Sequence, residues 1–172
     1  MPKLIKLGPP ELEGAGASWA DDPFTAVPDD EALPHGDVII SLTRFQREGD
    51  ALLSEGRAVG VRLEPHEEVE ALTYDLPRIA VVAPAFPKYR DGRAYTAARL
   101  LRERFGFTGE IRAVGDVLRE QAGFMVRCGF DAFEPADGST PEQWERATHR
   151  FRHVYQRAAD HREPAYVERA EG

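Results

Sequence analysis

The sequence has 172 residues and a formal net charge of -8 at pH 7, from 30 acidic and 22 basic residues. Hydrophobic content of 42% and charged content of 30% fit one compact soluble domain, and they exclude a disordered chain or a membrane protein. The single cysteine, Cys128, excludes an internal disulfide and a cysteine-only metal cluster, and the acidic balance argues against general nucleic-acid binding.

Residues 1–36 are predicted to form an irregular N-terminal arm, because six prolines and a cluster of acidic residues interrupt them. A short strand is expected at 3–7. Trp19 and Phe24 are candidates for anchoring the arm, either on the domain or on a partner. The first residues contain no long apolar region of the kind that a signal peptide requires, so a cytoplasmic protein is expected.

From residue 37 the chain alternates short apolar runs with amphipathic segments. The runs rich in β-branched residues predict five buried strands, at 37–42, 58–63, 78–83, 110–114 and 130–133. Helices are expected between them, at 94–105 and from 116 to about 128, together with one capped by Thr43 and a short one after Pro65. The glycines at 106 and 129 suit helix ends. A long C-terminal helix is expected to begin near Pro141.

This alternation predicts an α/β domain over residues 37–160, with a mainly parallel sheet of about five strands built from right-handed βαβ units. Five strands are too few for a closed eight-stranded barrel. An open doubly wound sheet and part of a barrel both remain possible. Residues 161–172 are predicted to form a polar C-terminal tail.

The carboxyl ends of parallel strands are where such sheets bind ligands, and charged residues follow several of these ends. The loop after the third predicted strand contains Asp91-Gly92, a good turn directly before a helix start. Backbone N–H groups and nearby cations would suit a small oxyanion there. The predicted anion-binding residues are Lys88, Arg90, Gly92 and Arg93. The candidate general acids or bases are Asp91, Asp116 and Glu134.

Each of these residues also has a purely structural interpretation. Residues 86–120 hold eight basic and five acidic residues, and the arginines can form surface ion pairs of little energetic value. Asp116 suits a helix N-cap, and Asp91 can pair with a neighbouring arginine. No metal site is predicted, since His149 and His153 stand at helical spacing without a nearby acidic partner, and no cofactor motif is present.

Residues 86–121, with 127–133 (Arg-Cys-Gly-Phe-Asp-Ala-Phe), closely resemble a bacterial family of unknown function, numbered 934 among such families. The likeness extends over roughly residues 28–160. The resemblance implies a cytoplasmic protein described as an oxidoreductase of sulfite reduction, encoded beside assimilatory sulfite reductase and adenylyl-sulfate reductase. It carries over no catalytic residues and no cofactor.

Two functions follow as hypotheses. The first is an accessory or electron-transfer-associated partner of the sulfite reductase hemoprotein or its electron donor. It would bind through its acidic surface and N-terminal arm, with an anion-binding loop at 88–93. The second is a small-anion enzyme, an oxidoreductase of sulfite reduction, which uses the Lys88–Arg93 loop and Asp116. Neither hypothesis involves nucleic acid or a membrane.

Overall fold

The computed structural model describes residues 4–8 and 16–171. The predicted arm residues 1–3 and 9–15, and Gly172 of the predicted tail, lie outside these ranges. The strands are β1 (Leu4–Leu7), β2 (Ala17–Ala20), β3 (Phe24–Ala26), β4 (Asp37–Ser41), β5 (Val59–Leu63), β6 (Val81–Phe86), β7 (Glu110–Gly115) and β8 (Ala132–Phe133). The α-helices are α1 (Leu42–Ser54), α2 (Arg93–Arg99), α3 (Ala122–Cys128), α4 (Pro141–Thr148) and α5 (Ala165–Glu171). The shorter turns are η1 (Val69–Leu72), η2 (Leu76–Arg78), the π-helical η3 (Leu100–Arg104) and η4 (Arg119–Gln121).

All eight described strands form one mixed sheet, in the order β2-β1-β8-β7-β6-β5-β4-β3. Strands β3 to β8 are parallel, and β1 is antiparallel to both of its neighbours. The α/β class is therefore confirmed, but the prediction of about five mainly parallel strands is wrong. The additional strands come from the segment expected to be irregular, where only 3–7 was predicted as a strand. β2 and β3 are four and three residues long, too short for a readable alternation.

The six parallel strands lie in the sheet in the same order as in the sequence, so the partial-barrel alternative is right and the doubly wound one is wrong. Consecutive right-handed crossovers place every connecting helix on the same face of such a sheet. That face carries the larger hydrophobic core, in which Val38, Val61 and Ile111 from the strands meet residues of the helices. The opposite, inner face carries a smaller cluster formed by Ile39, Val81, Ala83, Ala85 and Val114.

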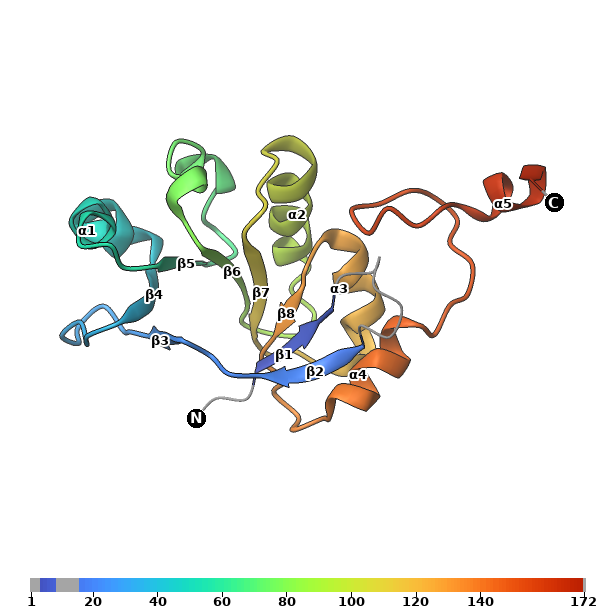
Figure 1. Ribbon diagram of the computed structural model, residues 1–172, viewed down its shortest axis with the longest axis horizontal. Helices are drawn as coiled ribbons and strands as arrows, with labels where there is room; N and C mark the ends of the chain where they lie inside the picture. The colour runs from blue at the N-terminus through green and yellow to red at the C-terminus, as the bar shows by residue number, and fades with distance from the viewer. Residues whose placement is uncertain (1–3, 9–15, 172) are drawn as a thin grey trace.

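The sheet is strongly curled because its two edge strands are neighbours in the sequence. Eight flat strands would separate the outermost pair by about 34 Å. Yet β2 and β3 are joined only by residues 21–23, and four Cα steps reach at most about 14 Å. Figure 1 shows β2 and β3 following one another along one side of the molecule. We call residues 21–23 the strap, since they draw the two edges of the sheet together.

The expected helices are present, with different ends. Ser41, rather than Thr43, caps α1, and its hydroxyl accepts a hydrogen bond from the Arg44 N–H at 3.0 Å. The long C-terminal helix is wrong. The helix α4 does begin at Pro141, where Thr140 and Gln143 form a capping box, but it ends at Thr148. Beyond it Val154 is buried, whereas Phe151 and Tyr155 are 69% and 89% exposed, so one buried residue is left where a continuous apolar face would be needed.

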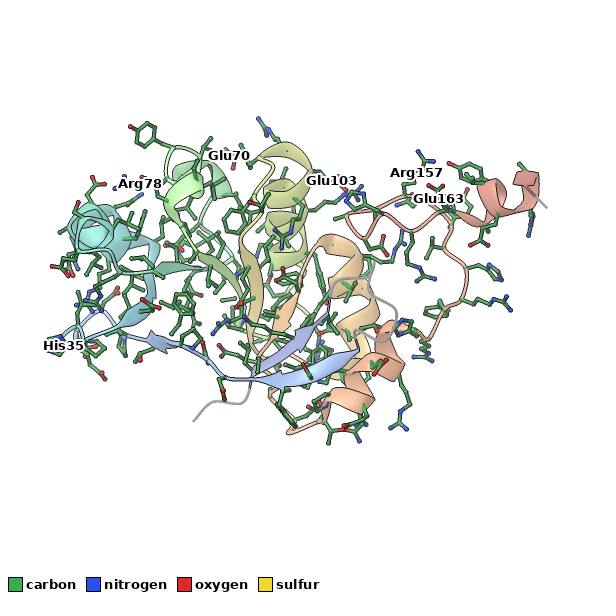
Figure 2. All side chains as sticks on the ribbon, in the orientation of Figure 1. His35, Glu70, Arg78, Glu103, Arg157 and Glu163 are labelled. Atoms are coloured by element: carbon green, nitrogen blue, oxygen red, sulfur yellow. The ribbon has the colours of Figure 1, made fainter. Side chains whose placement is uncertain are left out.

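The segment after α4 extends away from the rest of the protein and contacts it again at the end of α3. Arg127 of α3 pairs with Asp160 at 3.2 Å, and the Arg127 carbonyl accepts from the Ala159 N–H at 3.0 Å. Figure 2 shows Arg157 and Glu163 side by side on this segment, where they form an ion pair of 3.0 Å. In residues 4–8 and 16–171, no helix has both the length and the apolar character needed to cross a bilayer.

Candidate functional site

The predicted anion-binding residues lie where the sequence suggested, in the loop between β6 and α2. Arg93 is the first residue of α2, and Gly92 is its N-cap. The carboxylate of Asp91 accepts three hydrogen bonds from Arg93, from the backbone N–H at 3.2 Å, Nε at 2.9 Å and Nη2 at 2.6 Å. The hydrogen bonds from the Arg93 side chain lower the pKa of Asp91 to about 2. The helix start therefore already holds an anion, which belongs to the chain itself.

Asp116 forms a hydrogen bond to this loop instead of capping a helix. Its Oδ2 accepts from the Tyr89 N–H at 2.9 Å, while Gln121 Nε2 donates to the Tyr89 carbonyl at 2.7 Å. The Asp116 N–H also donates to Phe86 O at 2.7 Å, so the ends of β6 and β7 are tied together. α3 begins later than predicted, at Ala122, after η4. The structure thus brings Asp116 to the loop that carries Lys88, Arg90 and Asp91.

Most of the positive charge of residues 86–120 is neutralised within the protein. Six of the eight cations form ion pairs, and these pairs are spread over the molecule rather than gathered at one site: Arg93–Asp91, Arg99–Glu103, Arg102–Asp131, Arg104–Glu70, Arg112–Asp22 and Arg119–Glu120. The side chains of Lys88 and Arg90 form no hydrogen bond or ion pair with any residue of the described ranges. The guanidinium of Arg90 lies over the ring of Tyr89, 5.5 Å from its centre.

A second charged group lies on the inner face of the sheet and was missed by the sequence reasoning. Arg112 of β7 is fully buried. It binds Asp22 of the strap through two hydrogen bonds, of 2.6 and 3.0 Å, and Glu110 through one of 2.7 Å. Its Nη1 lies 3.3 Å from Glu134 Oε1, and its guanidinium lies 5.7 Å from the centre of the Phe24 ring. We call Arg112 and its three carboxylates the inner ion cluster.

Two more cations lie in line with Arg112 across the sheet. In the backbone register, Arg112 is opposite Ala132, and Ala132 is opposite Lys6. Arg62 is opposite Ser41 on one side and Ala83 on the other, so cations alternate with small residues across the sheet. Lys6 Nζ lies 2.6 Å from Glu110 Oε2, and Arg62 Nε lies 2.8 Å from Glu64 Oε1. The signal available in the sequence was an arginine in the middle of the apolar run 111–114. Its partner Asp22 is 90 residues away and gave no local signal.

Glu134, predicted as a general acid or base, belongs to the inner ion cluster and not to the loop. Burial raises its pKa above the ordinary value, and the nearby Arg112 partly offsets this effect. A carboxyl with a raised pKa retains its proton at higher pH, as a general acid must. In the described part of the chain, no hydrogen bond or ion pair joins Glu134 to residues 88–93. The three predicted catalytic carboxylates therefore divide between two places.

Comparison with protein families identifies the chain. Residues 60–166 match a family model described as "Bacterial protein of unknown function (DUF934)". The chain belongs to the DUF934 family. A comparison with curated proteins finds no match.

The DUF934 match includes most of both charged groups. The β6–α2 loop, Asp116, Arg112 and Glu134 all lie within residues 60–166. The partners that close the inner ion cluster from the N-terminal side, Asp22 and Lys6, precede the matched segment. The family region therefore supplies the buried Arg112, while β1 supplies Lys6, which pairs with Glu110, and the strap supplies Asp22, which pairs with Arg112.

Metal and thiol chemistry have few candidate groups in this DUF934 protein. Among residues 4–8 and 16–171, no group of three or more histidine, cysteine or acidic side chains is arranged to hold a metal ion. Cys128 at the end of α3 is buried, and burial raises the pKa of its thiol, while Arg99 and Arg127 lower it by less.

We expect Cys128 to react slowly in the folded protein, because the attacking species is the thiolate and the sulfur is covered. A chromogenic disulfide reagent at mildly alkaline pH should label the native protein at least about tenfold more slowly than the protein in denaturant. A native rate equal to the denatured rate would contradict the burial of this thiol.

Proposed function

We propose that this protein is an accessory partner in assimilatory sulfite reduction, which docks in the cytoplasm onto the sulfite reductase hemoprotein or its electron donor. The observation that carries the proposal is an uneven distribution of charge. Residues 21–77 hold fourteen acidic and four basic residues, whereas residues 78–172 hold fourteen acidic and sixteen basic ones. The acidic stretch folds as β3, β4, α1, β5, η1 and η2 at one end of the molecule (Figure 1).

An acidic end of this kind favours a basic partner. The side chains of Asp50 and Glu55 are 88% and 62% exposed, although each pairs with an arginine of the protein. Asp30, Glu31 and Glu68 are exposed as well. A surface of one sign steers a partner of the opposite sign and aligns it during encounter, and the effect weakens as salt screens it. The choice of sulfite reduction as the pathway rests on the resemblance of residues 86–133 to proteins that are encoded beside sulfite reductase.

Charge reversal at the acidic end is expected to abolish the docking. Asp30, Glu31 and Glu68 are exposed, and in the described residues their side chains form no ion pair, so changing them leaves the fold intact. The triple variant Asp30→Lys, Glu31→Lys, Glu68→Lys should lose at least about tenfold in association rate with the purified reductase or donor at low salt. The measurement is surface-immobilised binding kinetics across a salt series.

Two matched variants make this experiment decisive. The isosteric triple Asp30→Asn, Glu31→Gln, Glu68→Gln should show an intermediate effect, because it removes charge without adding the opposite sign. Arg169→Glu, at the other end of the molecule, should bind as the wild type does. The proposal fails if the native protein binds neither enzyme above background, or if co-purification from cells grown on sulfate yields no sulfur-assimilation enzyme.

A second candidate function is a small-anion enzyme that uses the β6–α2 loop. Lys88 and Arg90 favour it, since they stand without a carboxylate partner in the described residues on a loop braced by Asp116 and Gln121. We expect sulfite, sulfate or adenylyl sulfate to raise the melting temperature of the wild type, and Arg90→Ala to remove that shift. Equal shifts in both proteins would remove the loop as the site.

A further inference from the structure

A hollow of about 260 Å³ lies between η4 and α4, apart from the loop and the inner ion cluster. Its wall consists of Arg119, Glu120, Gln143, Arg146, Ala147 and Arg150. η4 supplies one side of the hollow. The other side is formed by residues 143, 146 and 147 on one face of α4 and by Arg150, two residues beyond its end. The wall is therefore shared between η4 and the C-terminal part of α4.

The residues that form the wall carry a net positive charge. Three guanidinium groups face one carboxylate, Glu120, which lies 3.5 Å from Arg119 Nε. Arg146 and Arg150 form no ion pair with any residue in the described ranges. The hydrogen bond from Thr140 lowers the pKa of the Glu142 carboxyl, and Arg146, one turn further along α4, is near enough to add to this effect. Arg150 lies two residues beyond the end of α4. Arginines elsewhere in the fold are mostly paired, as Arg44, Arg102 and Arg127 illustrate.

A structural role explains part of this arrangement. Cations near a helix C-terminus interact favourably with the helix dipole, and Arg150 also lies over the ring of Phe151 at 5.7 Å. Neither effect requires a third arginine from η4 facing the same hollow. Gln143 adds a possible donor, since its Oε1 accepts from the Thr140 N–H at 2.9 Å while its Nε2 has no hydrogen bond within the described chain.

We propose that this hollow binds a tetrahedral oxyanion, with a phosphate group as its ligand chemistry. The planar fork of arginine matches the oxygens of phosphate, and charge-assisted hydrogen bonds of this kind are among the strongest in proteins. Arg146 holds the anion from α4 and Arg150 from just beyond the end of that helix, Arg119 approaches it from η4, and the Gln143 amide donates to a further oxygen. The ion is either free phosphate or the phosphate of a larger metabolite.

The test is calorimetric titration of the full-length protein with inorganic phosphate, sulfate and glycerol phosphate at constant ionic strength. The wild type should bind phosphate saturably with one site. The double variant Arg146→Ala, Arg150→Ala should bind at least about tenfold more weakly for each arginine removed. Arg146→Lys with Arg150→Lys keeps the charge but loses the fork, so it should bind with intermediate affinity. Tighter binding of glycerol phosphate than of the free ion would identify an organic phosphate as the ligand.

Arg169→Ala is the matched control, because it removes an equally exposed cation from α5, at the far end of the C-terminal segment (Figure 1). It should bind phosphate as the wild type does. The inference is overturned if the wild type shows no saturable binding, if the double alanine variant binds equally well, or if Arg169→Ala loses as much affinity. Loss of binding in Arg90→Ala alone would also overturn it, by moving the site to the β6–α2 loop. These results are independent of whether the acidic end docks a partner.

Discussion

Replacing Arg112 with methionine is expected to lower the free energy of unfolding by about 3–5 kcal/mol. Methionine fills a similar volume but leaves the Asp22 carboxylate buried without its cation, while Glu110 keeps only its ion pair with Lys6. An uncompensated buried charge costs far more than the net value of the ion pair that it lost. Urea unfolding followed by circular dichroism measures the change, and the midpoint should fall with little change in the slope.

Two further variants separate this effect from general loss of charge. Arg99→Met removes an exposed arginine that pairs with Glu103 at 2.9 Å, and it should cost no more than about 1 kcal/mol. The double variant Arg112→Met, Asp22→Asn should recover part of the loss, because the buried carboxylate that lost its cation is removed as well. A midpoint for Arg112→Met equal to that of Arg99→Met would show that the inner ion cluster contributes little.

Trp144→Ala is expected to destabilise the protein by about 3–5 kcal/mol through the cavity that it leaves. The indole is fully buried, its ring lies 4.5 Å from that of Phe133, and its Nε1–H donates to Ser139 Oγ at 2.7 Å. This contact joins α4 to β8. Thermal and urea unfolding measure the loss, and Trp144→Phe should retain most of the stability because it keeps the ring packing.

Ser139→Ala is the control for the polar part of the Trp144 contact. It leaves the indole N–H without an acceptor, which costs about 1–3 kcal/mol, less than removal of the whole ring. If Trp144→Ala and Ser139→Ala had the same effect, packing against Phe133 would contribute nothing, contrary to the expectation.

The sequence predicted the part of the fold that has local signals. Apolar runs of five or six residues identified β4, β5 and β7. β6 lies three residues later than expected, because η2 extends to Arg78, the first residue of the predicted strand. The glycines at 106 and 129 do adopt positive φ at the ends of their helices, as their position after an amphipathic segment predicts. β2 and β3 were not predicted, because three or four residues carry too little pattern. They are strands because they pair with their neighbours in the sheet.

For the candidate site, too, the sequence indicated positions that follow from local pattern and missed those that depend on tertiary contacts. The carboxyl-end rule located the β6–α2 loop and Asp116, since strand positions follow from local pattern. It did not reveal that Asp91 and Arg93 bind each other, because a sequence does not give side-chain pairing. Arg112 and Asp22 meet only through the curl of the sheet, and Arg119 meets Arg146 only through the packing of η4 on α4. Contacts of this kind follow from topology and cannot be obtained from spacing.

The pairing of β1 with β8 joins the beginning of the chain to a strand that is synthesised much later, and this affects folding. β1 is made first, yet its neighbour β8 lies about 130 residues later, with Ile5 opposite Phe133. Closing so long a loop is entropically costly, and contacts of such separation slow folding. Until β1 and β2 dock, the edge of β8 presents unpaired N–H and C=O groups that can recruit a strand from another chain. A chain truncated by its first 26 residues should therefore be more prone to aggregate than the full-length protein.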